Sequence, residues 1–273
     1  PNCIASIRRI KVLKNIKIVS MLYDFVPFIM PEFYWPNFPE NYEKIIKDIV
    51  SITDCFLFIS EHTKKDFIKF FPEKVFKDRL YTIRLGDNIN ISKKSIKSKK
   101  KNYILTVSTI QPRKNHMLLL YIWKRLIEDF GYENTPILKI IGKKGWNMDS
   151  FFYYIENSPI LKEKIQIIES VTEIELDRFY KESIFTVYPS FYEGWGLPIC
   201  ESLSYGKLCL SSSTSSMKEA GGNLCKYFSP YSTDELYNLI VKYYFNSEEL
   251  ENEEKKIEKN YKSYSWLETS KEL

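Results

Sequence analysis

Residues 190–206, SFYEGWGLPICESLSYG, place two carboxylates around a glycine-containing turn. Glu193 lies in the turn, and Glu201 follows after seven intervening residues, in the first turn of a predicted helix. Carboxylates accept hydrogen bonds in pairs, and the vicinal hydroxyls of a sugar or a ribose donate in pairs. Gly194 and Gly196 let backbone N–H groups approach a ligand, and a helix N-terminus beside such a loop binds anionic phosphates. The segment therefore predicts a site for phosphate together with a sugar or ribose.

Each glutamate alone also has a purely structural interpretation. Glu201 would complement the helix dipole, and Glu193 would be a solvated loop residue. The two glycines and Pro198, which suits the first turn of a helix, agree in position with both carboxylates. This agreement favours a binding site over the structural interpretation.

A pair of adjacent cations lies in residues 108–115, STIQPRKN, just after a predicted strand. Arg113 offers a planar bidentate fork and Lys114 a point charge, a combination that suits a diphosphate. Taken alone, such residues before a helix more often form a solvated turn. Their presence in the same chain as the two glutamates favours diphosphate binding.

Short apolar runs alternate with amphipathic stretches along the whole chain. In the first part the predicted strands are 16–22, 55–60 and 80–85, and the predicted helices are 41–52 and 61–71. In the second part the predicted strands are 103–108, 137–141, 164–169, 184–189 and 208–212, and the predicted helices are 116–130, 150–157, 173–181, 197–205, 234–244 and 248–261. Continuous apolar strands separated by helices are typical of an α/β protein with parallel sheets covered on both faces. Such sheets bind ligands beyond the carboxyl ends of their strands.

The E-x7-E spacing of Glu193 and Glu201 resembles the motif of retaining glycosyltransferases of family 4. Residues 208–222, LCLSSSTSSMKEAGG, resemble the segment that follows the motif in that family. The resemblance covers about residues 17–266 and is strongest over 103–244. It implies a GT-B fold of two Rossmann-like domains, with the amino-terminal domain incomplete here.

The resemblance also implies roles for particular residues. Glu193 would contact the hydroxyls of the donor sugar and take part in catalysis with Arg113 and Lys114, which would bind the diphosphate. Glu201 would contact the ribose of the nucleotide. Donor contacts are further implied for the turn residues Gly194, Trp195, Gly196 and Leu197.

Three further positions fall at predicted strand ends where the family contacts its donor. Gly142 closes a strand, although a glycine there is usually only a turn. Val171 and Thr172 lie where the family has its base-contacting loop, and Thr172 would equally serve as a helix N-cap.

Residues 23–27, YDFVP, resemble the H-D-x-x-P segment beside the acceptor in this family. Asp24 is therefore an acceptor-side candidate. Tyr23 stands in place of the usual histidine, so no catalytic role is expected for it. Ser60 and Thr63 resemble a helix start, and His62 between them is expected on the surface.

The sequence predicts four regions. They are a partial amino-terminal acceptor-side domain (1–92), a basic linker (93–102), a donor-binding domain (103–245) and carboxyl-terminal helices that pack back towards the first domain (246–273). The run 92–101, SKKSIKSKKK, fits a solvated linker, and a patch for acidic lipid headgroups is the alternative. The abrupt start suggests a piece of a longer, multidomain glycosyltransferase; a naturally reduced amino-terminal half is the other option.

Composition narrows the classes of protein that remain. The five cysteines show no CxxC or Cys/His spacing, so neither a zinc site nor a disulfide framework is expected, and a reducing compartment fits best. No apolar run reaches the length of a membrane span. A cytoplasmic protein is predicted, with peripheral contact at the inner face of the membrane left open. Nucleic-acid binding is not expected, because the net charge of +5 is concentrated in the linker.

The predicted function is retaining transfer of a hexose from a nucleotide sugar to a growing surface glycan, free or lipid-linked. Mannose from GDP-mannose is favoured, as in lipopolysaccharide or other polysaccharide biosynthesis, and this rests on the resemblance alone. No Asp-x-Asp metal signature lies in a suitable loop, so the reaction is expected to need no metal and no cofactor. The alternatives are a non-catalytic module that binds a nucleotide sugar or a partner enzyme, and a nucleotide-sugar epimerase.

Overall fold

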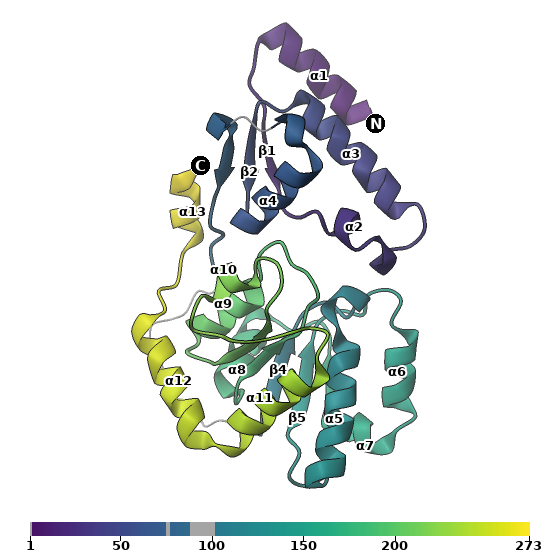
Figure 1. Cartoon of the computed structure of the whole chain (residues 1–273), viewed down its shortest axis with the longest axis vertical. Helices are drawn as coiled ribbons and strands as arrows, with labels where there is room; N and C mark the ends of the chain where they lie inside the picture. The colour runs from purple at the N-terminus through teal and green to yellow at the C-terminus, as the bar shows by residue number, and fades with distance from the viewer. Residues whose placement is uncertain (1, 75–76, 88–101) are drawn as a thin grey trace. The chain divides into compact units, whose positions relative to one another are not determined.

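The computed structural model describes residues 2–74, 77–87 and 102–273. The chain divides into two compact units. The first comprises residues 1–86, 193–195 and 265–273, and the second comprises 87–192 and 196–264. Both units are α/β, and each contains a parallel sheet (Figure 1).

The first unit is built on a three-stranded parallel sheet of order β1-β2-β3. Its strands are β1 (Val19–Leu22), β2 (Cys55–Phe58) and β3 (Leu80–Thr82), and its α-helices are α1 (Asn2–Lys14), α2 (Val26–Ile29), α3 (Phe38–Ile52), α4 (Glu61–Phe70) and α13 (Trp266–Glu272). Val19 pairs with Cys55, and Phe56 pairs with Leu80.

Phenylalanines form the core of the first unit. Phe67 of α4 is fully buried, and its ring centroid lies 4.6 Å from that of Phe56, 5.1 Å from that of Phe58 and 5.4 Å from that of Phe71. Tilted and offset aromatic pairs at such distances add to the stabilisation from burial. The cluster fixes α4 against the sheet.

The second unit contains a six-stranded parallel sheet of order β6-β5-β4-β7-β8-β9. Its strands are β4 (Tyr103–Val107), β5 (Ile137–Ile141), β6 (Ile165–Ile168), β7 (Thr186–Tyr188), β8 (Cys209–Ser212) and β9 (Lys226–Phe228). Its α-helices are α5 (His116–Phe130), α6 (Asp149–Glu156), α7 (Pro159–Lys164), α8 (Glu173–Glu182), α9 (Leu197–Ser204), α10 (Met217–Gly221), α11 (Thr233–Phe245) and α12 (Ser247–Asn260).

The strand order of this sheet reverses direction between β4 and β7. From β4 the chain proceeds outwards to β5 and β6, and it then returns to form β7 on the other side of β4. Loops at such a switch point diverge and leave a crevice beyond the carboxyl ends of the strands. The loops that follow β4 and β7 begin at residues 108 and 189, so the two predicted binding segments come from this switch point.

The structure confirms the predicted fold class, because every strand pair in both sheets is parallel. Among the α-helices and strands of the structure, six match none of the predicted ranges: α1, α2, α7, α10, α13 and β9. Helix α1 escaped prediction because basic residues interrupt its apolar pattern, and the other five span only three to seven residues. The predicted linker lies outside the described residues except for Asn102. The domain division remains a prediction.

Asp87 holds the end of α12 to the body of the second unit. Its carboxylate accepts hydrogen bonds from the hydroxyl of Tyr261 at 2.7 Å, the backbone N–H of Tyr264 at 3.0 Å and the hydroxyl of Ser204 at 3.4 Å. The side chain is buried, with 6% of its surface exposed. Removing it would leave buried donors without their acceptor.

We therefore expect Asp87→Ala to lower the free energy of unfolding by about 3 kcal/mol, measured by urea denaturation. Glu251→Ala, on the exposed face of α12, is the matched control and should change it by less than about 0.5 kcal/mol. Equal effects of the two substitutions would show that Asp87 does not hold this helix.

Candidate functional site

The cationic loop after β4 forms a short 3-10 helix, Pro112–Lys114. Arg113 Nη1 donates a hydrogen bond to the carbonyl of Tyr192 at 2.6 Å. Lys114 Nζ donates to the hydroxyl of Tyr188 at 3.0 Å and lies 5.3 Å from the centroid of that ring. Lys114 is thus directed towards the last residue of β7, and Arg113 towards the segment that follows this strand.

Asn115 ties this loop to two others. Its backbone is left-handed, with a φ of 58°, a conformation that asparagine tolerates better than most residues. Its buried amide donates to the carbonyl of Pro189 at 3.2 Å and to that of Pro230 at 2.9 Å. Sequence analysis gave Asn115 no role, although an asparagine before a helix start is a signal for this geometry.

Two buried polar atoms at the same edge have no hydrogen-bond partner among the described residues: Gln111 Oε1 and Ser190 Oγ. Buried polar groups in proteins are ordinarily hydrogen-bonded. Gln111 precedes the cationic helix, and Ser190 follows the proline that Asn115 contacts. Both atoms are thus unsatisfied acceptors or donors beside the cationic loop.

His116 begins α5 and is completely buried. Burial, and to a lesser extent the charge of Lys114, lowers the pKa of His116 to about 3. Its Nε2 lies 3.2 Å from the hydroxyl of Ser108. The imidazole is therefore neutral at physiological pH and adds no charge to the cationic loop.

Glu201 lies in α9 and is buried, with 8% of its surface exposed. One of its carboxylate oxygens accepts a 2.7 Å hydrogen bond from the hydroxyl of Tyr180 in α8. Burial raises the pKa of Glu201; the bond from Tyr180 lowers it, and the nearby charge of Asp87 raises it further. The ring of Tyr180 stacks on that of Tyr205, with centroids 5.1 Å apart, so the donor to Glu201 is held in place.

The start of α9 has the backbone that its sequence predicts. Gly196 occupies the N-cap with a φ of 123°, a conformation that side chains disfavour. Its carbonyl accepts a bond from Ile199 N at 2.9 Å. Leu197 is the first helical residue and is half-buried. The N–H groups of this turn lack a side-chain cap.

Gly142 has a clear packing role. A Cβ at this position would lie 2.0 Å from the carbonyl oxygen of Ser108. The close approach lets the loop after β5 bond to the loop after β4, through Ile110 N to Lys143 O at 2.9 Å and Gly145 N to Ile110 O at 2.8 Å. This finding supports a structural role and leaves any donor contact of Gly142 as a prediction.

Thr172 is the N-cap of α8. Its hydroxyl accepts from Glu175 N at 3.2 Å, while the Glu175 carboxylate accepts from Thr172 N at 2.8 Å, which completes a capping box. Val171 is half-buried and packs on the cluster around Tyr103 and Tyr180. The N-cap interpretation of Thr172 is therefore correct, and base contact by either residue remains a prediction.

Residues 193–195 group with the first unit. Glu193 and Trp195 are buried, with 8% and 9% of their surfaces exposed. A Cβ on Gly194 would come within 2.1 Å of the carbonyl oxygen of Tyr23. The hydroxyl of Thr63 lies 3.3 Å from each of the carbonyl oxygens of Tyr23 and Gly194. Only glycine fits at position 194.

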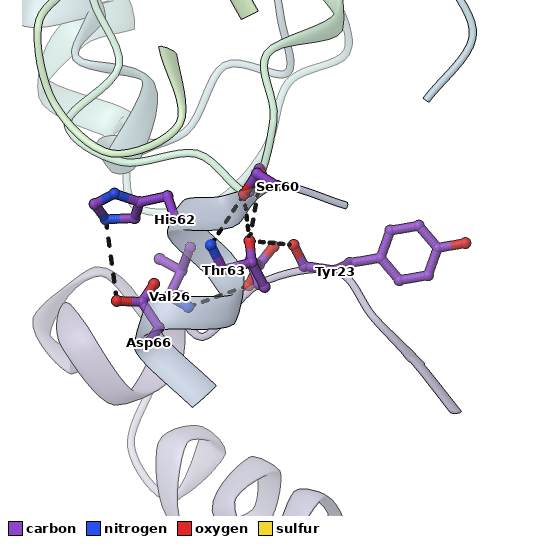
Figure 2. A network of polar contacts seen from close by, with 8 residues as sticks. Tyr23, Val26, Ser60, His62, Thr63 and Asp66 are labelled. Carbon is purple, nitrogen blue, oxygen red and sulfur yellow. Dashed lines mark hydrogen bonds and ion pairs between the residues drawn. The ribbon is translucent and has the colours of Figure 1, made fainter. Parts of the chain in front are cut away.

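Figure 2 shows the polar network at the start of α4. The hydroxyl of Ser60 accepts a bond from Thr63 N at 3.0 Å, as the sequence predicted for a helix start. The ring of Tyr23 points away from Thr63 and is 59% exposed. His62 lies on the surface, 4.0 Å from Asp66.

Asp24 begins α2. Its carboxylate accepts a bond from Val26 N at 3.1 Å, and its carbonyl accepts one from the hydroxyl of Tyr42 at 3.0 Å. The structure thus gives Asp24 a role in positioning the backbone. Its predicted place beside the acceptor is not tested by these contacts.

Comparison with known proteins decides the family. The sequence profile described as "Glycosyl transferases group 1" matches residues 87–263. The chain belongs to this family. The resemblance to retaining family 4 glycosyltransferases is therefore confirmed, over the region that holds both the cationic loop and the glutamates.

Two curated relatives come from Escherichia coli. The chain is 26% identical over 226 residues to O-antigen chain mannosyltransferase B, covering 79% of this chain and 58% of the relative. It is 24% identical over 239 residues to the serotype-specific mannosyltransferase WbdA, covering 83% of this chain and 29% of the relative. The chain thus spans only part of the length of these relatives.

Solved glycosyltransferase structures share the fold. The Anabaena protein HepE, in complex with UDP and glucose, superposes with a TM-score of 0.74 at 13% identity, covering 99% of this chain and 74% of that one. Staphylococcus aureus TarM superposes with a TM-score of 0.69 at 16% identity, covering 95% of this chain and 51% of that one. The two-sheet architecture is the GT-B fold.

No helix among residues 2–74, 77–87 and 102–273 is long and apolar enough to cross a membrane. Within the same residues, no group of three or more His, Cys, Asp or Glu side chains could hold a metal ion. Metal independence of the reaction stays a prediction.

The buried charge of Glu201 should cost folding stability. The pKa of Glu201 in the folded protein is raised above the ordinary value of 4.5, so its ionisation is less favourable in the folded state than in the unfolded state. The folded state is therefore not penalised below pH 4.5, and it loses stability as the pH rises through the raised pKa. We expect Glu201→Gln to raise the free energy of unfolding by about 1 kcal/mol at pH 7.5, because Tyr180 still finds an acceptor while the buried charge is removed.

Urea unfolding at pH 7.5 and at pH 4.0 tests this, and the difference between the proteins should vanish at the lower pH. Glu175→Gln serves as a control of opposite sign. Hydrogen bonds from Thr172 lower the pKa of Glu175, so its carboxylate stabilises the fold above pH 4.5 and its loss should destabilise at pH 7.5. A Glu201→Gln protein that is less stable than wild type at pH 7.5 would contradict the assignment.

Proposed function

We propose that this chain is the donor-binding part, with some of the acceptor side, of a retaining glycosyltransferase. It transfers a hexose from a nucleotide sugar to a growing surface glycan. One observation carries the proposal: Arg113, Lys114 and Asn115 are all hydrogen-bonded to residues 188–192, at the switch point of a parallel sheet. Two cations, two orphan polar atoms and a glycine-led helix start occur in these loops, which is the composition of a phosphate site.

The proposed roles follow from the chemistry of each group. Arg113, Lys114 and the N–H groups at the start of α9 stabilise negative charge on the departing diphosphate. Glu201 accepts hydrogen bonds from the ribose hydroxyls, and Tyr180 fixes the orientation of its carboxylate. Glu193 accepts hydrogen bonds from hydroxyls of the donor sugar.

The reaction retains the configuration of the anomeric carbon. The bond from that carbon to the diphosphate oxygen breaks, and the acceptor oxygen bonds to the carbon on the same face. The acceptor proton passes to the leaving phosphate. No protein nucleophile and no metal take part in this scheme, which comes from the family resemblance.

Mannose and GDP are the proposed sugar and nucleotide. The support is that both curated relatives described above are named mannosyltransferases. The acceptor is proposed to be a glycan or lipid-linked glycan of the O-antigen kind, and the reaction is placed in the cytoplasm. Contact with the inner face of the membrane is proposed through basic residues of α1, which include Arg9 and Lys14.

Calorimetric titration with GDP-mannose, GDP, UDP-glucose and UDP tests the donor site directly. Wild type should bind GDP-mannose and GDP in preference to the uridine nucleotides. Arg113→Ala and Lys114→Ala should each weaken GDP binding at least about tenfold, because each removes a charge-assisted contact with the diphosphate. Glu201→Ala should have a similar effect through the ribose.

Lys181→Ala is the matched control, since Lys181 pairs with Asp177 on α8, outside the cationic loop and the turn into α9, and it should bind GDP like wild type. If well-folded wild-type protein binds none of the four ligands, the donor-site proposal fails. Preference for UDP would reject the choice of nucleotide and leave the site in place.

Glu193→Gln separates binding from transfer. We expect kcat for mannose transfer to fall about 100-fold or more, because the contact of Glu193 with the sugar matters most in the transition state. The affinity for GDP should stay within about threefold, since GDP carries no sugar for Glu193 to contact. The assays are run with and without EDTA, and equal rates are expected. Normal transfer by Glu193→Gln, or loss of activity in EDTA, would contradict the scheme.

A further inference from the structure

Helices α5, α6 and α7 of the second unit pack together (Figure 1). Their side chains line a groove. It encloses about 470 Å³, a size typical of small-ligand sites. We name it the tyrosine groove after the residues that line its walls and rim: Tyr121, Lys124, Glu128, Tyr153, Tyr154 and Ile160.

Aromatic rings form the walls of the tyrosine groove and are exposed to solvent. Tyr121 is 51% exposed, Tyr153 64% and Tyr154 49%. The rings of Tyr153 and Tyr154 are nearly perpendicular, at 76°, with centroids 6.4 Å apart. The floor is apolar and buried, with Leu120 and Leu161 exposed by 2% and 7%. Several large exposed side chains around a buried floor mark an interaction surface and not scattered surface apolar residues.

The rim is polar and carries no net charge. Lys124 and Glu128 form a pair with 3.9 Å between Nζ and Oε1, so their charges offset each other. Asn157 adds an amide, which also donates to the carbonyl of Tyr153 at 2.9 Å. Ammonium, carboxylate and amide groups together can donate to and accept from hydroxyls.

We propose that the tyrosine groove binds a segment of neutral glycan. Sugar rings have apolar C–H faces and hydroxyl-bearing edges, which match aromatic walls and a polar, charge-balanced rim. Tyrosine suits this partner because its ring is apolar and its hydroxyl is polar. An anionic lipid or a nucleic acid would need an excess of positive charge, which this rim lacks.

The tyrosine groove is separate from the donor site. Helix α5 begins at His116, directly after the cationic loop. Tyr121 and Glu128 lie five and twelve residues further, about 8 and 18 Å along the helix. The groove would therefore hold a part of the glycan remote from its growing end. Retention of a glycan in this way raises its effective concentration at the enzyme.

The choice of glycan rests on the proposed function, so the probe is a neutral α-linked mannotetraose titrated into the chain by calorimetry. Wild type should bind it saturably. The double variant Tyr153→Ala/Tyr154→Ala should bind at least about tenfold more weakly, and Tyr153→Phe should bind like wild type because it keeps the ring. Tyr81→Ala is the matched control, since Tyr81 lies in β3 of the first unit and is 51% exposed. Circular dichroism and the urea midpoint verify that each variant folds.

Failure of this inference and failure of the proposed function have different signatures. Glu201→Ala should lose GDP binding and keep the tetrasaccharide, whereas the tyrosine variant should do the reverse. Absence of tetrasaccharide binding by wild type, or equal binding by the tyrosine variant, would overturn the glycan assignment even if GDP binds. Concentration-dependent dimerisation that the tyrosine variant abolishes would also overturn it, in favour of a second copy of the chain. Tetrasaccharide binding without nucleotide binding would support the groove and reject the donor site.

Discussion

The loops at the switch point of the second unit depend on one buried amide. Asn115 bonds to the carbonyls of Pro189 and Pro230, and so joins the loops that follow β4, β7 and β9. These carbonyls lie in irregular backbone, where no strand or helix provides a partner. The left-handed backbone of Asn115 turns the chain from the cationic loop into α5. The positions of Arg113 and Lys114 follow from this tether, because both side chains bond to the segment that it holds.

A second constraint is electrostatic. The protein buries Glu201 beside Tyr180 and in the field of Asp87, although burying a carboxylate is unfavourable. Asp87 meets a different need, since it satisfies donors at the end of α12. Two acidic groups in one interior thus have different partners: Asp87 accepts bonds from the end of α12, and Glu201 accepts one from Tyr180. The neutral state of His116 keeps further positive charge out of this interior.

The sequence predicted the features that depend on residues close together in the chain. Helix α5 was predicted at both ends, because an apolar periodic run spans residues 116–130. The E-x7-E spacing and the Arg-Lys pair are also short-range patterns, and they indicated the candidate site. The partners of these residues could not be predicted, because Tyr180 is 21 residues from Glu201, and Pro230 is 115 residues from Asn115. Element α7 was missed because six residues show no clear period.

The capping box of Thr172 and Glu175 has a consequence for protein engineering. The hydrogen bonds of Thr172 stay within its own helix start, so the N-terminus of α8 is anchored locally. The cationic loop is held by other contacts, through Asn115 to residues 189 and 230. Thr172 and Glu175 can therefore be exchanged for another capping pair while the loops held by Asn115 keep their shape. Glu169 must be kept, because its carboxylate accepts a hydrogen bond from Lys144 N at 3.2 Å, in the loop that also bonds to Ile110. The start of α8 and the cationic loop are thus separately adjustable parts of this fold.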